Sequence, residues 1–560
     1  MVILGVVAGH AAHGKSLRDG AAAVIVDGRL ACAVAEERLL RAKHAGGWDA
    51  AASAVLNDAG LDSQDVDVVA YSSCCDYQQE HPPDRAAIRS RFRSAQIVRV
   101  GHHRSHALMA YFSSPFERAL VCVSDAGGNT LAPVPDGRWW DVPREQTSYW
   151  IADGDQLRLV DDDFREAGAA GFGEVFRAVT YLLGWHSSVY ASKTMALAAT
   201  GDPNGLSLSP PWTAIGDRLC SSVRAMPHDP IEMLRRHDRE RLGRVVEARD
   251  PKDRFSSTQR DLAAWVQDGM EQVMTARLSR IIEATSVDAV CMAGGVAYNC
   301  HANTAVADAL GLGHRNVFIP AAPGDTGQAL GNAIAACLEV NEALDRSSLA
   351  ELYAGPRWPP PGANDLSGLQ VTPIPTDGPR HVVDLVAAGA VVAVHRGRSE
   401  FGARALGHRS LIADPGRESM RLRLNLRKGR EDWMPFGLMV SSHCAPKCLQ
   451  KARHSPSMQF VAQVAPEARQ SLAAVTHVDG STRAQTLDGR CEPWLEETLL
   501  LAEERLGVGA LLNTSLNGPG EPIAERPSQT LDLLRRGVAD AAVIDDLLVA
   551  TRGTKERGGT

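Results

Sequence analysis

The chain has 560 residues, of which 44% are hydrophobic and 22% are charged, and its formal net charge is −8. One hydrophobic core rarely serves so long a chain, so we expect two domains, and the acidic balance argues against a nucleic-acid partner. The sequence has no apolar run long enough for a transmembrane helix, no secretion signal at its start, and eleven scattered cysteines. These features predict reduced thiols in a cytoplasmic protein without a membrane partner.

The first predicted elements are a strand over residues 2–7 and a hairpin over 21–34 that turns at Asp27-Gly28. Between them, GHAAHGKS at 9–16 fits the phosphate-loop pattern GxxxxGK[ST]. That motif needs a helix immediately after it, so that the helix N-terminus faces the phosphate. A hairpin in that place argues against a P-loop NTPase and is typical of an actin-like ATPase half.

Two histidines follow the predicted helices at 50–59 and 84–94. His102 and His106 are four residues apart, so a helix would present both imidazoles on one face. Imidazoles at that spacing suit a divalent metal, whereas a lone histidine is more often structural.

A predicted strand at 119–123 ends just before Asp125, and Gly127 and Gly128 follow. A carboxylate and glycines after a strand suit a turn that binds a metal–nucleotide pair. The sequence therefore adds a possible anionic ligand to the two histidines.

An apolar stripe from residue 262 to 282 predicts a core helix, which leads to a strand at 289–292. Gly294, Gly295 and Asn299 come next, and a strand, a Gly-Gly turn and a helix make a good nucleotide cradle. Asp325 lies farther on, in a loop before a helix of small residues.

The stretch 395–436 holds the densest cluster of basic residues and glycines, after an apolar strand at 391–394. Guanidinium groups bind phosphate or carboxylate in a fixed fork geometry, and glycines let backbone approach a ligand closely. The pattern indicates a pocket for a polyanion such as ATP or carbamoyl phosphate, with a solvated basic face as the alternative. The basic residues of this cluster include Arg398, Arg404, Arg409, Lys428 and Arg430.

This segment resembles the O-carbamoyltransferase family of the nodulation-factor, cephalosporin and tobramycin type. The family pattern is close to GR-x-EFG-x-RALG-x-RS-[IL]-x-ADP, followed by K-x-RE and PF. The sequence has GRSEFGARALGHRSLIADP at 397–415, KGRE at 428–431 and PF at 435–436. A match of this length is highly specific.

The resemblance implies an α/β fold with two domains. Residues 1–354 would form an actin-like (Kae1-like) domain that carries the metal and nucleotide site. Residues 370–560 would form a YrdC/Sua5-like domain that makes carbamoyl-adenylate, and the Pro/Gly-rich residues 355–369 would link the two.

The resemblance also implies a set of functional residues. The metal ligands would be His102, His106, Asp125 and Asp325, and the family points to Fe(II), although spacing alone leaves manganese and zinc open. The catalytic residues would be Lys43, Arg404, Lys428 and Arg483. The residues that bind substrate or nucleotide would be Gly127, Gly128, Gly294, Gly295, Asn299, Arg398, Arg409, Arg430, Asn513, Ser515 and Asn517.

The implied reaction has two steps. Carbamoyl phosphate and ATP, the latter with Mg, would form carbamoyl-adenylate and pyrophosphate in the second domain. The first domain, with its iron, would pass the carbamoyl group to a hydroxyl of a small molecule, such as an antibiotic or natural-product precursor, and AMP would leave. The identity of the acceptor and the oligomeric state, including a homodimer, stay open.

Two positions depart from the family pattern. Arg18 stands where the family usually has a histidine, which His10 or His13 could replace, and Met434 stands where it usually has an arginine. These departures leave the general base of the transfer step open.

Three other functions compete with this interpretation. A tRNA threonylcarbamoyl-type transferase uses the same two folds, but the acidic net charge argues against it. A hydrogenase-maturation carbamoyltransferase would need an acylphosphatase domain and paired CxxC motifs, which the sequence lacks. A P-loop GTP switch conflicts with the hairpin after Ser16.

Overall fold

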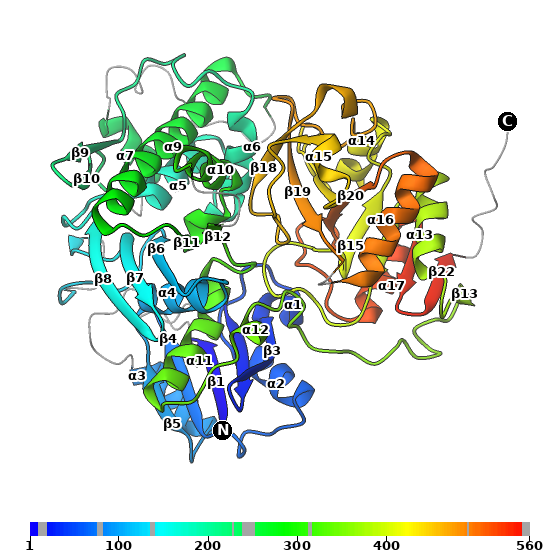
Figure 1. Cartoon of the computed structure of the whole chain (residues 1–560), viewed down its shortest axis with the longest axis horizontal. Coiled ribbons are helices and arrows are strands. Elements are labelled where there is room, and N and C mark those ends of the chain that lie inside the picture. Colours follow the sequence, from blue (N-terminus) through cyan, green and yellow to red (C-terminus); the bar gives the residue numbers. More distant parts are fainter. Residues whose placement is uncertain are drawn as a thin grey trace. The chain divides into compact units, whose positions relative to one another are not determined.

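The computed structural model describes residues 1–8, 19–74, 82–134, 141–226, 229–237, 253–311, 316–489 and 492–551. The chain divides into two units (Figure 1). The N-terminal unit comprises Met1–Glu36 and His44–Glu351, and the C-terminal unit comprises Glu37–Lys43 and Leu352–Thr560. The predicted phosphate-loop stretch at 9–16, with its two histidines, and Arg18 lie outside the described residues.

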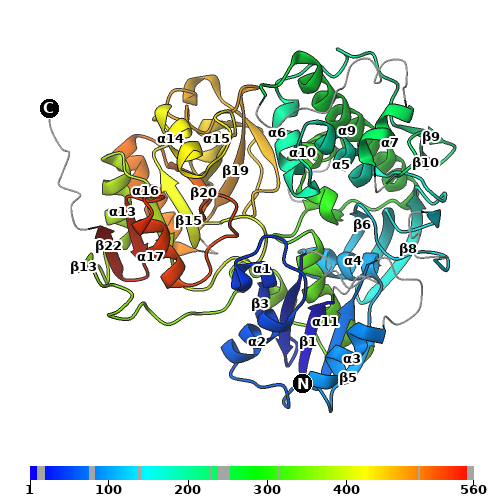
Figure 2. The same ribbon diagram turned by 180° about the vertical axis from the view of Figure 1, so that it is seen from behind.

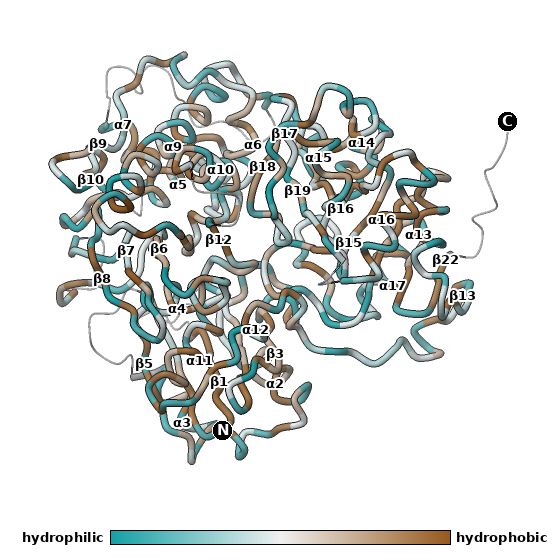
Figure 3. Tube along the Cα trace, viewed as in Figure 1, coloured by the Kyte–Doolittle hydropathy of each residue, from teal (hydrophilic) through white to brown (hydrophobic). Residues whose placement is uncertain are grey.

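The first sheet of the N-terminal unit has five strands around a central apolar one. Its order is β3 (Arg29–Ala35), β2 (Ala21–Val26), β1 (Val2–Val7), β4 (Val68–Ser72) and β5 (Gln96–Arg99). The first three strands are antiparallel, and β4 and β5 continue parallel to β1. The predicted strand and hairpin are confirmed, and the brown trace of β1 in Figure 3 fits its central position.

The second sheet of this unit repeats the same arrangement. Its order is β8 (Gln156–Asp163), β7 (Thr147–Asp153), β6 (Arg118–Ser124), β11 (Val290–Ala293) and β12 (Val317–Phe318). Again three strands are antiparallel, and two more continue parallel to the central strand. The N-terminal unit is therefore built from two sheets of one topology.

Two helices pack against each other at the centre of this unit. Helix α4 (His102–Phe112) packs on β6 and β11, and α11 (Gln328–Glu339) packs on β1 and β4. The helices approach so closely that a Cβ on Gly331 would lie 2.1 Å from the carbonyl oxygen of Ser105. This contact requires glycine and brings the first turns of both helices together.

A helical layer adjoins the second sheet (Figure 2). The predicted core helix is confirmed as α9 (Ser257–Thr285), which begins with a capping box of Ser256 and Gln259. It packs against α5 (Phe172–Leu182), α6 (Ala191–Ala198) and α10 (Cys300–Ala309). The remaining described elements of this unit are α2 (Asp49–Asp58), α3 (Pro82–Arg91), β9 (Trp212–Ile215), β10 (Arg218–Ser221), α7 (Pro230–His237) and α12 (Arg346–Leu349).

The C-terminal unit is organised around one mixed sheet of ten strands. Its centre holds β21 (Ala541–Ile544), β14 (Val392–His395), β15 (Arg409–Ala413), β20 (Ala510–Ser515), β16 (Gly437–Ser441) and β19 (Ser481–Leu487) in that order. One edge is β13 (Leu369–Pro373) and β22 (Leu547–Thr551), and the other is β18 (Val461–Val464) and β17 (Leu449–Gln450).

Helices cover both faces of this sheet because its strands alternate their side chains. Val392 and Val394 face one core with α13 (Gly378–Ala387) and α16 (Pro493–Leu506). Ala393 faces the other core with α14 (Ser419–Arg427), α15 (Ala445–Cys448) and α17 (Pro527–Arg535). The arginine-rich stretch leaves this sheet at the end of β14.

A short N-terminal segment belongs to the C-terminal unit. Helix α1 (Glu36–Leu40) follows β3, yet residues 37–43 group with the C-terminal unit. The division predicted at residue 354 did not include this segment, and residues 355–369, expected as a linker, fall within the C-terminal unit. Within the described part of the chain, no helix is long and apolar enough to cross a membrane.

Candidate functional site

The two histidines of the predicted metal site lie on the first turns of α4. The helix begins after Gly101, and the side chain of Asn129 accepts a hydrogen bond from the His102 backbone N–H at 2.8 Å. Both imidazoles are buried, with 2% of His102 and none of His106 exposed. The expected placement of the pair on one helical face is confirmed.

The two predicted carboxylates lie beside these imidazoles. His106 Nε2 is 3.3 Å from Asp125 Oδ2 and 3.2 Å from Asp325 Oδ1. His102 Nε2 is 3.5 Å from Asp325 Oδ1 and 3.9 Å from Asp125 Oδ2. One ligand atom from each of the four residues lies within 4.8 Å of the others.

The two carboxylates of this cluster favour a positive charge between them, either a proton on an imidazole or a bound metal ion. Burial alone would lower the pKa of His106, but the hydrogen bonds and charges of Asp125 and Asp325 raise it to about 9. Hydrogen bonds with His102 and His106, together with the charges of these imidazoles, hold the pKa of Asp125 well below its ordinary value, although its burial acts in the opposite direction. Two imidazoles and two carboxylates around one point fit a divalent transition metal, which must displace a proton to bind.

Sequence reasoning missed one residue of this cluster. Gln328 Nε2 donates to Asp325 Oδ1 at 2.9 Å and lies 3.2 Å from His106 Nε2. Its Oε1 accepts from the Ser72 hydroxyl at 2.8 Å, which fixes the orientation of the amide. The one sequence feature that could have identified Gln328 is its position three residues after Asp325, at the start of α11.

Among the glycines of the predicted cradle, Gly294 is required by the backbone itself. Gly294 has a φ of +88°, and a Cβ there would lie 2.1 Å from the Ser124 carbonyl oxygen. The Gly295 N–H donates to Asp125 Oδ2 at 3.1 Å, which ties the Gly-Gly turn to the metal cluster. At Gly128, a Cβ would lie 2.6 Å from Glu145, and at Gly127 it would lie 3.2 Å from Arg144.

Asn299 has a structural role at the start of α10. Its side chain accepts the Ala302 N–H at 3.0 Å and so caps α10. It also exchanges two hydrogen bonds with the amide of Gln267, at 3.0 and 2.8 Å. These contacts fix the orientation of the amide, and its contact with nucleotide stays a prediction.

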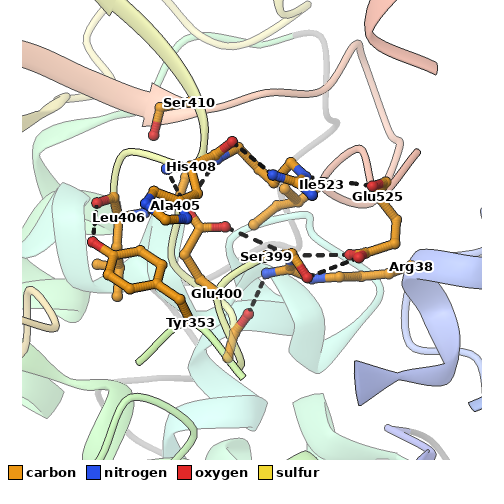
Figure 4. Close-up of polar contacts among 12 residues, drawn as sticks. Arg38, Tyr353, Ser399, Glu400, Ala405, Leu406, His408, Ser410, Ile523 and Glu525 are labelled. Atoms are coloured by element: carbon orange, nitrogen blue, oxygen red, sulfur yellow. Dashed lines mark hydrogen bonds and ion pairs between the residues drawn. The ribbon is translucent and has the colours of Figure 1, made fainter. Parts of the chain in front are cut away.

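In the C-terminal unit, Glu400 organises the loop that carries Arg404. Its Oε1 accepts three backbone N–H groups, from Leu406 at 2.7 Å and from His408 and Arg409 at 3.0 Å (Figure 4). Gly407 has a φ of +115°, which a side chain would strain. These contacts turn the loop back into β15.

Arg409 belongs to the framework of this loop, which argues against its predicted role in binding. It is fully buried, and its guanidinium donates to the carbonyl oxygens of Arg396, His408 and Gly397 at 2.7, 3.0 and 2.9 Å. Asn513 is similar, since its amide donates to the Ala405 carbonyl and to Gln485, both at 3.1 Å. The Arg409 guanidinium is thus occupied by loop carbonyl groups, whereas Asn513 keeps a buried Oδ1 that has no hydrogen-bond partner among the described residues.

The framework role of Arg409 predicts a large loss of stability when it is replaced. Arg409→Met would leave the carbonyl oxygens of four residues without this donor and would remove one of the buried positive charges near Glu400. The cost should be about 3–5 kcal/mol. We expect the unfolding midpoint of the C-terminal unit to fall by about 10 °C in calorimetry. The control is Arg417→Met, since Arg417 is exposed and pairs with Asp414; an equal loss there would contradict the assignment.

Lys428 is buried beside two residues predicted to bind substrate. Its Nζ donates to Asn517 Oδ1 and to the Ser515 carbonyl oxygen, both at 2.6 Å. Burial, followed by the charges of Arg430 and Lys43, lowers the pKa of Lys428 well below its ordinary value. The structure therefore brings together Lys428, Ser515 and Asn517.

The other predicted cations of this pocket vary in burial. Arg430 stacks over Phe436 at 4.9 Å, and burial and the charge of Arg483 lower the pKa of Arg430 to about 10. Arg404 is half-buried, and Arg398 donates weakly to the Ala354 carbonyl at 3.5 Å. Clustered cations with depressed pKa values are typical of an anion site.

Lys43 groups with this pocket and not with the metal cluster. It is exposed at the end of the segment that joins the C-terminal unit, and its charge lowers the pKa of Lys428. Lys43 was expected in the domain of residues 1–354 but belongs to the C-terminal unit, and its catalytic role stays a prediction.

Comparisons with known proteins match both units. The model "Carbamoyltransferase N-terminus" matches residues 84–334, and "Carbamoyltransferase C-terminus" matches residues 383–551. The nodulation protein NolO of Bradyrhizobium diazoefficiens is 30% identical over 81% of this chain and 79% of its own length. The chain belongs to the carbamoyltransferase family.

Two further relatives extend this finding. The nodulation protein NolNO of Sinorhizobium fredii is 28% identical over 96% of this chain and 79% of its own length. The 3'-hydroxymethylcephem-O-carbamoyltransferase of Streptomyces clavuligerus is 34% identical over 45% of this chain and 47% of its own length. The carbamoyltransferase described here is thus a transferase enzyme with O-carbamoyltransferase homologues.

One of the two departures from the family pattern has a described position in this carbamoyltransferase. Met434 is 8% exposed, and its backbone carbonyl accepts from the Asn425 amide at 3.0 Å. Arg18 lies outside the described residues. The general base of transfer accordingly stays a prediction.

Proposed function

We propose that this carbamoyltransferase carbamoylates a hydroxyl group by way of carbamoyl-adenylate. Carbamoyl phosphate would first be hydrolysed to carbamate and inorganic phosphate. A carbamate oxygen would then attack the α-phosphorus of ATP and displace pyrophosphate. The acceptor oxygen would finally attack the carbamoyl carbon, lose its proton and displace AMP, so that one difficult substitution is divided into easier steps.

The cation pocket of the C-terminal unit carries this proposal. Arg430 interacts electrostatically with Lys428 and Arg483, and burial makes the charges of Lys428 and Arg430 costly. Phosphate groups would compensate these charges, and the cations would in turn stabilise the charge that develops on the leaving pyrophosphate. Arg404 and Arg398 lie on the loop above, where they would add contacts to ATP or carbamoyl phosphate.

The metal cluster supports the second step. His102, His106, Asp125 and Asp325 would hold Fe(II), with manganese and zinc as alternatives, and the metal would act as a Lewis acid toward phosphate oxygens. Gly294 and Gly295 would form the nucleotide cradle next to Asp125. Gly127 and Gly128 would keep the opposite turn close to the cluster.

The two units would divide the reaction between them. We assign an actin-like (Kae1-like) fold to the N-terminal unit, because its two sheets share one strand order and one pattern of directions. The C-terminal unit would be the YrdC-like domain that forms the adenylate, with the Pro/Gly-rich residues 355–369 at its start. Residues 37–43, and therefore Lys43, would serve adenylate formation.

A product assay tests the proposed function. The enzyme, loaded anaerobically with Fe(II), is incubated with carbamoyl phosphate, ATP, Mg and a panel of hydroxylated small molecules, and products are read by mass. We expect an O-carbamoylated acceptor together with AMP, pyrophosphate and phosphate, and no product when ATP is omitted. A carbamoylated product formed without ATP would contradict the adenylate.

A lysine in the phosphate-loop pattern provides a further prediction. Lys15 lies outside the described residues, but β2 and β3 form the predicted hairpin after it, where a P-loop requires a helix. Lys15→Ala should therefore retain nearly full carbamoyl-phosphate-dependent exchange of labelled pyrophosphate into ATP. A fall of this exchange to background would restore the phosphate-loop hypothesis.

A further inference from the structure

Arg38 is a buried guanidinium supplied to the C-terminal unit by the segment Glu37–Lys43. Only 2% of its side chain is exposed, and its Nη2 donates to the Gly402 carbonyl at 2.8 Å. Three residues later, Arg41 donates to the carbonyl oxygens of Ile523 and Pro522, at 2.7 and 2.8 Å. The segment is thus fixed both to the loop that carries Arg404 and to the stretch before α17.

Two buried carboxylates face the Arg38 guanidinium. Its Nη1 is 3.4 Å from Glu525 Oε2 and 3.7 Å from Glu400 Oε2, and neither glutamate side chain is exposed (Figure 4). Burial would raise the pKa of Glu400, but the charge of Arg38, followed by those of His408 and Arg409, outweighs it and lowers the pKa. Arg38 therefore helps to keep Glu400 ionised where an isolated carboxylate would be costly.

Each carboxylate holds one side of the arginine loop. Glu400 accepts the three backbone N–H groups that close the loop after Arg404. Glu525 Oε1 accepts the Ser399 hydroxyl at 2.8 Å and the Trp358 indole N–H at 3.1 Å, which fixes the loop before Arg404. Arg38 thus contacts the loop directly at Glu400 and Gly402, and its third partner, Glu525, binds the loop through Ser399.

We infer that Arg38 is a positioning residue for adenylate formation, which holds the loop of Arg404 in its active shape through Glu400, Glu525 and Gly402. The inference rests on the proposed function of the C-terminal unit. It means that the adenylate-forming site is complete only when a segment from the N-terminal part of the sequence is bound in it. Arg38 itself touches no substrate.

The test combines pyrophosphate exchange with limited proteolysis of the full-length protein. Arg398 and Arg404 are trypsin sites inside the loop, so cleavage there reports whether the loop is held closed. We expect Arg38→Met to be cut at these two residues under conditions in which the wild type is intact there, as identified by fragment mass. We also expect its exchange rate to fall on the order of 100-fold, mainly in kcat, because a displaced Arg404 no longer meets the transition state.

Conservative and control variants separate positioning from general loss of structure. Arg38→Lys keeps the positive charge, so it should recover part of the protection against trypsin and part of the exchange rate. If Arg38→Met does not fold, Arg38→Lys is compared with the wild type in its place. Arg417→Met, on the exposed surface of the same unit, should match the wild type in both assays.

The outcomes distinguish this inference from the proposed function. Loop cleavage in Arg38→Met with undiminished exchange would overturn the inference and leave the proposed function intact. A protected loop in Arg38→Met, or an Arg38→Lys variant no better than Arg38→Met, would overturn it as well. A wild-type enzyme without carbamoyl-phosphate-dependent exchange would overturn the proposed function, and the inference with it.

Discussion

Arg404→Ala is expected to stop pyrophosphate release from ATP and carbamoyl phosphate. Arg404 lies on the loop that Glu400 closes, in the same unit as the cation cluster of Lys428, Arg430 and Arg483. Loss of one charge-assisted contact in a mostly dehydrated pocket should cost about 2–4 kcal/mol, or about 30- to 1000-fold in rate. The measurement is carbamoyl-phosphate-dependent exchange of labelled pyrophosphate into ATP.

A matched control separates this effect from a change in surface charge. Arg505 is an exposed arginine of the same unit that pairs only loosely with Asp384, at 3.5 Å. Arg505→Ala should exchange pyrophosphate at the wild-type rate. Normal exchange in Arg404→Ala would show that the arginine loop does not serve adenylate formation.

The second large effect concerns the metal cluster of the N-terminal unit. The wild-type protein purified anaerobically should bind about one Fe(II) per chain, and His106→Ala should bind almost none, because an incomplete ligand set loses the metal. His106 is fully buried and lies within 3.3 Å of both carboxylates, so no water-exposed group can easily replace it. Metal content is measured by elemental analysis and binding by calorimetry.

The same variant tests the division of labour between the units. His106→Ala should still exchange pyrophosphate into ATP, but it should no longer pass the carbamoyl group to a hydroxyl. His186→Gln, which alters an exposed histidine of the same unit, should keep both the metal and the transfer activity. Full metal occupancy in a His106→Ala, Asp325→Ala double variant would refute the ligand assignment.

A Lys43 variant is unsuitable for testing whether the N-terminal unit carries out the transfer step. The resemblance to the O-carbamoyltransferase family implied that Lys43 belongs to the transfer site of the N-terminal domain. The structure groups it with the C-terminal unit, where its charge acts on Lys428. Loss of Lys43 is therefore expected to affect adenylate formation, and only metal-ligand variants isolate the transfer step.

The sequence by itself determined the local features of this carbamoyltransferase. Alternation and turn residues identified β1 and the hairpin of β2 and β3, and the apolar stripe identified α9. The four-residue spacing of His102 and His106 placed both on one face of α4. Each of these features depends on neighbours within a few residues, so the pattern in the chain contains the required information.

Only the tertiary structure decided which polar residues hold the protein backbone in place and which are left to bind ligands. Arg409, Asn513 and Asn299 look like ligand-binding residues in the sequence, but each also makes hydrogen bonds with protein groups that are distant in the chain. Gln328 and Arg38 gave little sign in the sequence, yet each lies at the centre of a polar cluster. Buried polar groups must find partners, and those partners are brought together by helix and strand packing, which residue spacing does not encode.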